Sequence, residues 1–286
     1  MKSPGLKACQ SRLRKFLSGA ARARPEPLPA GRQAIEVLIE AVLEADAPRK
    51  VAAAACQALL QSYVDLNELR VATPREMADC WPKDFPGAAQ KGEGLTRALN
   101  RLFEYSYQMS LDHMKEVPRR ELRQHLLGLG LSPYAAARVL LALFDQPAIP
   151  VDSTLVEALE LDGLLPRGAA LADVQALLER LVPPRLAGAA HAFLRAYVER
   201  SLPAVERKRK KEAQAAARTE RLAAQARAKA EGEAKAKAEV QARAEAAAQA
   251  KAQSEAKARV RKAQARKVRA RRAKSDKAQR GTKAAT

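Results

Sequence analysis

Apolar residues recur at helical spacing through the first two thirds of the chain. Ile35, Leu38, Ile39, Val42 and Leu43 follow the i, i+3, i+4, i+7, i+8 pattern that places one apolar stripe on a helix. Further stripes are Leu95, Leu99, Leu102, Phe103 and Tyr107; Leu171, Val174, Leu177, Leu178 and Leu181; and Leu186, Ala190, Phe193, Leu194 and Val198. No stretch alternates with period two for long enough to predict a strand. Because proline and glycine turn signals separate the stripes, the pattern predicts an all-α body of about eight to ten short helices.

One helix start is specified locally. Thr73 is a good N-cap residue, Pro74 suits the first helical position, and Glu76 stands where a capping-box glutamate belongs. We therefore expect a helix to begin at Pro74.

The last part of the chain lacks such stripes. Residues 206–286 contain 28 alanines, and Lys, Arg, Glu and Gln supply most of the rest, all strong helix formers. The larger apolar residues there are Leu222, Val240, Val260 and Val268, which form no sustained coiled-coil seam. We expect a fluctuating single helix or a disordered segment. The predicted divisions are a flexible basic arm (1–30), a helical domain (31–203) and a basic tail (204–286).

Charge divides the chain at the same place. The formal net charge is +20, but residues 206–286 hold 26 Lys/Arg and 9 Asp/Glu, whereas residues 1–205 hold 26 and 23. Such a tail suits a polyanion, and its lack of aromatic residues favours duplex DNA over single strands. RNA, an acidic protein, or a merely solvated extension are the alternatives. The tail cations expected to contact DNA are Lys208, Arg209, Lys210, Lys211, Arg261, Lys262, Arg266, Lys267, Arg271 and Arg272.

The cysteines and the N-terminal segment indicate the setting. Cys9, Cys56 and Cys80 are an odd number without CxxC spacing, which argues against a disulfide scaffold or a zinc ribbon and indicates a reducing compartment. We expect no metal and no other cofactor. No apolar run is long enough to span a membrane. We expect a cytoplasmic, nucleoid-associated protein. Residues 1–24 hold seven Lys/Arg and no acid, which suits a flexible arm or, as the alternative, an organelle presequence.

Two neighbouring motifs carry a family resemblance. The run from Gly130 to Leu141, GLSPYAAARVLL, is a tight turn that opens an apolar helix, and QPAIPVDSTL follows over residues 146–155. Together they resemble the helix-hairpin-helix and the Gly/Pro-rich loop with aspartate of the endonuclease III-like DNA glycosylases. The resemblance covers roughly residues 31–202. It implies a two-lobed helical domain and double-stranded DNA as partner.

The resemblance assigns a catalytic role to Asp152. A base-excising enzyme needs a fixed carboxylate beside the sugar carbon, because that carbon gains oxocarbenium character as the base leaves. The alternative is that Asp152 only caps the helix that begins near Ser153. Tyr134 occupies the position of the family's Schiff-base lysine, and no Lys occurs from 116 to 207. The implied enzyme is therefore a monofunctional glycosylase without lysine-dependent lyase activity.

The hairpin is implied to hold a DNA backbone. Gly130 forms the turn, and the amides of Leu131, Ser132 and Tyr134 would face a phosphate. An ordinary helix–helix turn is the alternative, and the Tyr134 side chain would either contact the sugar-phosphate backbone or pack inside. His191 stands among small apolar residues and reads as a core histidine.

The sequence also departs from the family. Ser132 replaces the hairpin's second glycine, the four-cysteine iron–sulfur loop is absent, and acidic Asp46 follows the early core helix, where the family often has a polar residue that fills the space left by a flipped base. The function implied is that of a DNA-binding, base-excision-repair-like protein, acting as a monofunctional glycosylase on a damaged or mismatched base. The alternative is a non-enzymatic DNA-binding or nucleoid-associated protein with the same fold.

Overall fold

The computed structural model describes residues 4–25 and 31–282, and every regular element in these ranges is helical. The side chains of residues 4–7 and of several positions from 252 onward, among them Arg266, Arg271 and Arg272, lie outside the description. The α-helices are α1 (Pro4–Leu17), α2 (Ala34–Glu44), α3 (Arg49–Ser62), α4 (Leu66–Val71), α5 (Pro74–Asp79), α6 (Ala88–Ser106), α7 (Leu122–Gly128), α8 (Pro133–Leu143), α9 (Ser153–Leu161), α10 (Leu171–Leu181) and α11 (Ala187–Thr282). Short 3-10 turns occupy Ser18–Arg22, Asp112–Lys115 and Pro184–Leu186. The predicted all-α class is confirmed.

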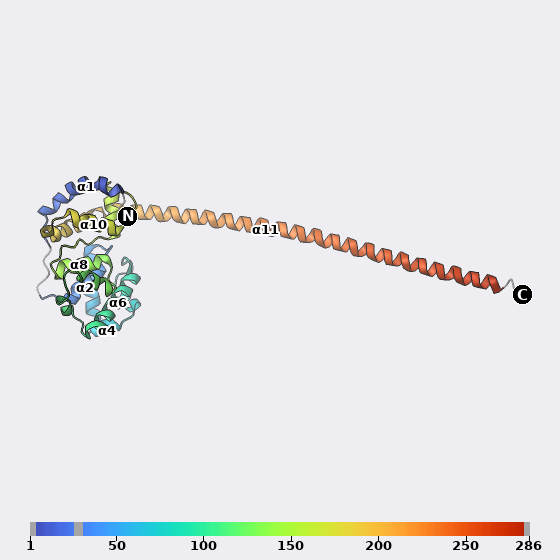
Figure 1. The fold of residues 1–286 in the computed structure, drawn as a ribbon, viewed down its shortest axis with the longest axis horizontal. Helices are drawn as coiled ribbons and strands as arrows, with labels where there is room; N and C mark the ends of the chain where they lie inside the picture. Colours follow the sequence, from blue (N-terminus) through green and yellow to red (C-terminus); the bar gives the residue numbers. More distant parts are fainter. Residues whose placement is uncertain (1–3, 26–30, 283–286) are drawn as a thin grey trace. The chain divides into compact units, whose positions relative to one another are not determined.

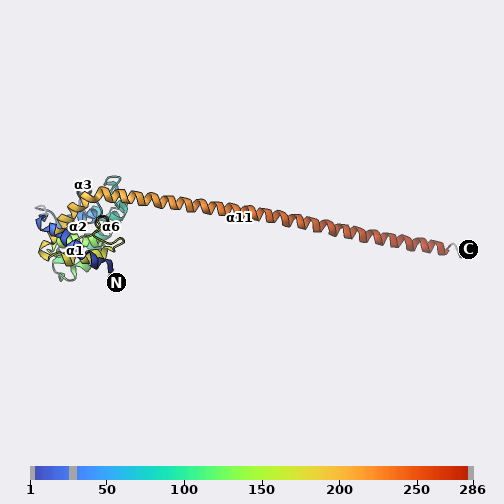
Figure 2. The same ribbon diagram turned by 90° about the horizontal axis from the view of Figure 1, so that it is seen from above.

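The chain divides into two units, Met1–Lys210 and Lys211–Thr286, which we call the body and, from here on, the basic tail. The predicted boundary after residue 203 lies too early. Val205 is fully buried in the body, and Lys208 and Arg209 pair with glutamates of α9. The tail itself is one unbroken helix to Thr282, orange to red in Figure 2.

The body has two hydrophobic cores, each of which defines a lobe. The first lobe contains α2 to α8, with α2 packed against both α3 and α8, around fully buried residues such as Leu38, Ile39 and Leu99. The second lobe contains α1, α9, α10 and the start of α11, around Leu159 and other apolar residues. Figure 1 shows the two groups, α1 and α10 in one and α2, α4, α6 and α8 in the other.

The N-terminal segment differs from the prediction. Instead of a flexible arm, α1 places Cys9, Leu13 and Leu17 on one buried face of the second lobe, and Ala20 follows in the same core. Phe16 packs against Phe193 of α11 with its ring tilted by 55° and the ring centroids 5.1 Å apart. The basic residues that suggested an arm lie between these apolar positions. Residues 1–3 and 26–30 of the predicted arm lie outside the described residues.

The local prediction at α5 is confirmed. Thr73 is the N-cap, its hydroxyl accepts from the amide of Glu76 at 3.3 Å, and the Glu76 carboxylate accepts from the amide of Thr73 at 2.7 Å. Pro74 is the first helical residue, where its missing amide hydrogen costs nothing. This capping box fixes the beginning of α5 next to α6, on which part of the candidate site is built.

Candidate functional site

The turn between α7 and α8 has the backbone of a hairpin. Gly130 has a φ of +90°, a conformation that other residues rarely adopt, and a Cβ there would lie 2.7 Å from Cδ of Arg97. Ser132 has a φ of −65° and is the N-cap of α8, its hydroxyl accepting from the amide of Ala135 at 3.2 Å. The first position therefore requires glycine, whereas the second does not, because its serine has an ordinary helix-capping conformation.

The hairpin leaves backbone donors without acceptors. Within residues 4–25 and 31–282, no group accepts a hydrogen bond from the amides of Leu131, Ser132 or Tyr134. Unpaired amides at the start of a helix favour an anion such as a phosphate. The side chain of Tyr134, in contrast, is buried at 4 % exposure, and burial, followed by the charge of Glu44, raises its pKa well above the usual value. The Tyr134 side chain was expected either to contact the sugar-phosphate backbone or to pack inside the protein, and the structure shows that it packs inside.

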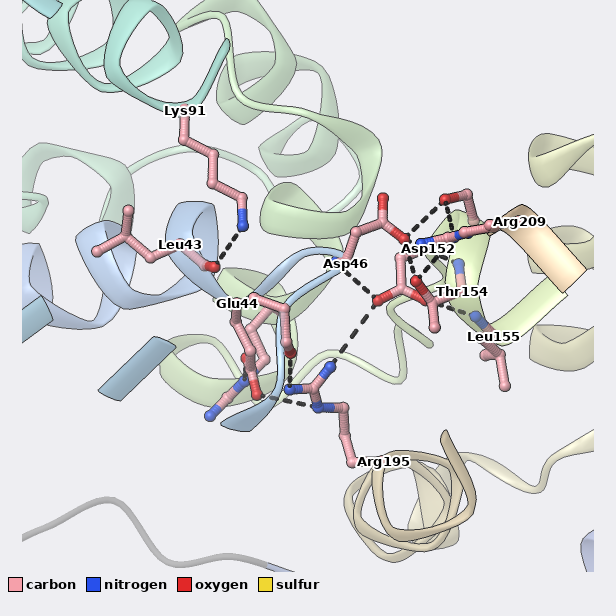
Figure 3. A network of polar contacts seen from close by, with 12 residues as sticks. Leu43, Glu44, Asp46, Lys91, Asp152, Thr154, Leu155, Arg195 and Arg209 are labelled. Atoms are coloured by element: carbon pink, nitrogen blue, oxygen red, sulfur yellow. Dashed lines mark hydrogen bonds and ion pairs between the residues drawn. The ribbon is translucent and has the colours of Figure 1, made fainter. Parts of the chain in front are cut away.

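Asp152 lies at the start of α9 and caps it. Its Oδ1 accepts from the amide of Leu155 at 2.8 Å, and its Oδ2 accepts from the amide of Asp46 at 3.0 Å (Figure 3). The side chain is almost fully buried, with 5 % of the residue exposed. The predicted capping role is thereby confirmed. The carboxylate is also fixed from two directions, as a catalytic group must be.

Asp46 makes the reciprocal contact from the loop after α2. Its Oδ1 accepts from the hydroxyl of Ser153 at 2.7 Å and from the amide and hydroxyl of Thr154, each at 2.8 Å. The residue has a φ of +54°, which aspartate tolerates better than most residues. Its carboxylate is therefore used in joining the two lobes. The carboxylate thus has partners within the protein at a position where the family often has a polar residue.

A buried arginine of α11, Arg195, lies between the carboxylates of Asp152 and Glu44. Nη1 of Arg195 lies 3.8 Å from Oδ2 of Asp152, its Nε lies 3.4 Å from Oε1 of Glu44, and its Nη2 donates to the carbonyl of Ala47 at 3.0 Å (Figure 3). Glu44 also pairs with Arg138 of α8 at 3.1 Å. These contacts hold the end of α2 against α8 and α11.

The pKa of Asp152 is raised. Burial is the main cause and the neighbouring Asp46 carboxylate adds to it, whereas the two amide hydrogen bonds and Arg195 act in the opposite direction. The charged form of this carboxylate is therefore less stable in the protein than it would be in water. Such perturbed pKa values are common at functional sites.

Lys91 of α6 lies beside this network and interacts with the charges of Asp46 and Asp152. Its Nζ donates to the carbonyl of Leu43 at 2.8 Å and lies 4.4 Å from the centre of the Phe85 ring. Burial lowers its pKa to about 8, although the charges of Asp46 and Asp152 oppose that shift. It ties the last turn of α2 to α6 and so supports the loop that carries Asp46.

A groove of about 780 Å³ runs between the lobes at this point. One wall holds the hairpin residues Gly130, Leu131 and Ser132 together with the start of α6. The other wall holds Ser153, Glu157 and Arg209, and Asp46 lies along it as well. Asp152 lies directly behind this surface, since it is bonded to Asp46 and precedes Ser153. The hairpin residues and Asp46 thus line one groove, and Asp152 is bonded to that lining without lining the groove itself.

The predicted tail cations fall into three groups. Lys208 and Arg209 belong to the body and pair with α9. The exposed residues are Lys210, Lys211, Arg261, Lys262 and Lys267. Arg266, Arg271 and Arg272 lie outside the described side chains. The single cluster expected over 208–211 is therefore split, because only its first two residues reach the acidic face of α9.

Other candidate chemistry is sparse in the described part of the chain. His191 is buried at 6 % exposure, as a core histidine should be, and burial lowers its pKa well below the usual value. The cysteines are unpaired, and no three described His, Cys, Asp or Glu side chains are grouped as metal ligands. No helix among the described residues combines the length and apolar character that crossing a bilayer requires.

Comparison with solved structures identifies the fold. No model of a known protein family matches the chain, and no curated protein sequence matches it. Endonuclease III in a trapped covalent intermediate with DNA, and in a non-covalent DNA complex, is 20 % identical with a TM-score of 0.50, covering 65 % of this chain and 84 % of endonuclease III. The 8-oxoguanine glycosylase/lyase of Clostridium acetobutylicum, bound to double-stranded DNA with cytosine opposite 8-oxoG, is 15 % identical with a TM-score of 0.50, covering 68 % and 70 %.

The body therefore has the fold of the helix-hairpin-helix DNA glycosylases. Endonuclease III is among the solved structures to which it is similar. At these identities the likeness concerns the fold, and the function must be argued from the site.

Sequence reasoning missed three residues of the site. Arg195 stands alone in the apolar run HAFLRAYV of α11, and a lone charge in a buried stripe is a usable signal for a buried ion pair. Glu157 and Lys91 carried no such signal, because a charged residue on a helix is most often solvated.

Proposed function

We propose that the chain binds duplex DNA and excises a damaged or mismatched base as a monofunctional glycosylase. The observation that carries the proposal is the fixed, buried carboxylate of Asp152 behind a groove whose opposite wall is a hairpin with unpaired amides. The likeness in fold to endonuclease III in complex with DNA supports it.

The geometry suits base removal. As the base leaves, positive charge develops on the sugar, and a carboxylate fixed nearby stabilises it without having to reorganise. The Leu155 and Asp46 amides hold both oxygens of Asp152 in place, and Arg195 favours its charged form. Burial strengthens the effect because the surroundings have a low dielectric constant.

The position of Tyr134 supports a single activity. A buried phenol cannot attack a sugar carbon to form a Schiff base, which requires an amine. We therefore infer that the product is an intact abasic site. Strand cleavage would follow only on treatment with alkali.

Two regions supply the proposed DNA contacts. The hairpin amides would position one phosphate without reading sequence. The basic tail, with 22 Lys/Arg against 8 Asp/Glu over residues 211–286, would add affinity that depends strongly on salt and little on sequence. Because neither contact reads a base, the choice of lesion depends on the groove.

The test is a panel of duplexes that each carry one damaged or mismatched base, incubated with the protein and then heated with alkali. We expect alkali-labile sites with at least one lesion and none after Asp152→Asn. The matched control is Asp65→Asn, since Asp65 caps α4 through the same kind of bonds, to the amides of Asn67 and Glu68. Excision that persists in Asp152→Asn would contradict the proposed role.

A specific observation favours a second candidate, a DNA-binding protein without catalysis. Both oxygens of Asp152 accept hydrogen bonds, and Arg195 lies 3.8 Å from one of them. A role in joining the lobes would therefore account for this carboxylate without any catalysis. The same panel separates the two functions. Tight duplex binding with no alkali-labile product on any lesion would select the non-enzymatic protein.

A further inference from the structure

The groove wall opposite the hairpin carries an arginine–glutamate pair. Arg209, near the end of the body, donates from Nε to both carboxylate oxygens of Glu157 at 3.1 Å and from Nη2 to one of them at 3.0 Å. The same Nη2 lies 3.1 Å from the hydroxyl of Thr154 and 3.3 Å from that of Ser153 (Figure 3 shows Arg209 beside Thr154). Both charged residues line the groove.

This pair is open to exchange. The side chains of Arg209 and Glu157 are 38 % and 23 % exposed, so water and ions reach both. A partly exposed ion pair contributes little stability, whereas a guanidinium binds a phosphate through two parallel hydrogen bonds of comparable geometry. A carboxylate on the groove wall repels a nucleic-acid backbone, so an entering phosphate would compete with Glu157 for the same donors.

We propose that Arg209 binds a phosphodiester of the strand that enters the groove, and that Glu157 holds the guanidinium until DNA arrives. The proposal rests on the proposed duplex binding and adds a second phosphate site to it. The hairpin amides hold one phosphate on the opposite wall, so a nucleotide in the groove would be fixed on both sides.

Exchange at Arg209 would leave the carboxylate of Asp152 in place. Ser153 and Thr154 donate their hydroxyl hydrogens to Asp46, and those bonds do not involve the guanidinium. The amide bonds of Asp152 are independent of it as well. Arg209 is therefore a binding residue that can change partner without disturbing the group behind the groove.

The test compares two full-length variants that lose the same charge. Arg209→Gln removes the groove cation, and Lys210→Ala removes its exposed neighbour, which does not line the groove. The affinity of each variant is measured for two duplexes of the same sequence. One duplex is intact, and the other contains a stable abasic analogue whose sugar can leave the helix. We expect Lys210→Ala to weaken both complexes equally, and Arg209→Gln to weaken the abasic complex by about tenfold more than the intact one.

The Glu157→Gln variant should change the affinity for the abasic duplex in the opposite direction. It removes the competing carboxylate, so we expect tighter binding of the abasic duplex, by more than the matched loss of an exposed charge in Glu121→Gln. The gain should vanish in the Arg209→Gln background. A single methylphosphonate linkage, placed at successive positions beside the abasic site, should abolish the Arg209→Gln effect at one position.

Three results would overturn the inference. Equal losses for Arg209→Gln and Lys210→Ala on both duplexes would assign Arg209 to general charge alone. Weaker binding by Glu157→Gln, together with a lower melting temperature for both variants, would make the pair a structural link between α9 and α11. If the unaltered protein binds neither duplex, the proposed function fails together with the inference; if it binds and only the variants disagree, the inference alone fails.

Discussion

The body and the basic tail use their cations differently. Residues 1–210 hold 30 Lys/Arg against 24 Asp/Glu, and several of these charges are paired across helices, as in Arg138–Glu44 and Arg123–Glu179. Residues 211–286 hold 22 against 8, and their described side chains are exposed. The first pattern helps to hold the groove together, whereas the second suits the phosphate contacts that we propose for the tail.

The difference separates selectivity from attachment. A site that discriminates one nucleotide needs buried, oriented groups, and only the body has a core in which to hold them. The proposed attachment needs charge but no core, and the tail carries its basic residues among alanines on a helix. Arg209 lies where the two regions meet along the chain and is the last described cation held by several body residues.

Removing the tail should have the largest effect on binding. Ending the chain after Lys210 deletes 22 Lys/Arg, so we expect duplex affinity at about 0.15 M salt to fall by roughly a hundredfold or more. The slope of log affinity against log salt should flatten. Titration of a labelled duplex at several salt concentrations measures both. Unchanged affinity would show that the tail does not contact DNA.

The hairpin glycine should have the next largest effect. Gly130→Ala forces a side chain into a positive φ and within 2.7 Å of Arg97, so we expect a loss of about 1–3 kcal/mol in the free energy of unfolding and weaker duplex binding. The matched control is Gly128→Ala, since Gly128 is helical and a Cβ there meets nothing within 4 Å. Urea unfolding and duplex titration distinguish them. Equal behaviour of the two variants would remove the special role of the turn.

Lys91 should make the stability of the body depend on pH. Its pKa is lowered from 10.5 to about 8 in the folded protein, so between pH 8 and 10.5 the unfolded chain binds more protons and stability rises with pH. Relative to Lys91→Met, we expect the unaltered protein to gain ~2 kcal/mol over that range. Urea unfolding at several pH values tests this, with the exposed Lys50→Met as control. If the difference in unfolding free energy between the unaltered protein and Lys91→Met is the same at every pH, the lowered pKa of Lys91 is contradicted.

Asp152→Asn should have the smallest effect on the fold. Burial raises the pKa of Asp152 in the folded protein above its unfolded value of 3.8. The folded state therefore binds more protons than the unfolded state between these two pKa values, and stability falls as the pH rises through that range. At pH 7, above the unfolded pKa, the charged carboxylate carries this cost. An uncharged asparagine avoids this cost and retains an oxygen for one amide bond. We expect an unchanged or slightly higher melting temperature at pH 7, measured by calorimetry. A strongly destabilised variant would indicate that the ion pair with Arg195 dominates.

Local features of the structure were predictable from the sequence. The capping box at Thr73 and the cap at Asp152 depend on residues within three positions of each other. The helical stripes of α2 and α6 follow from apolar periodicity alone.

The prediction at α1 was wrong although the signal was present. Cys9, Leu13 and Leu17 are spaced for one helical face, but the basic residues between them were given more weight. A short amphipathic helix can carry many cations on its solvent side and still pack through a narrow stripe.

Long-range pairings were beyond prediction. Arg209 meets Glu157 across 52 positions, and Asp46 meets Thr154 across 108. No local pattern specifies such partners, because they depend on how the two lobes pack. The groove exists only in the folded body, and its wall is assembled from segments that the sequence treats separately.

The central claim is that the body performs chemistry through Asp152 while the tail provides attachment. The most direct measurement is single-turnover base release from a lesion-bearing duplex, with protein in excess so that all DNA is bound by both the unaltered chain and Asp152→Asn. We expect alkali-labile sites with the unaltered chain and none with the variant, at equal occupancy. Equal release by both proteins would contradict it.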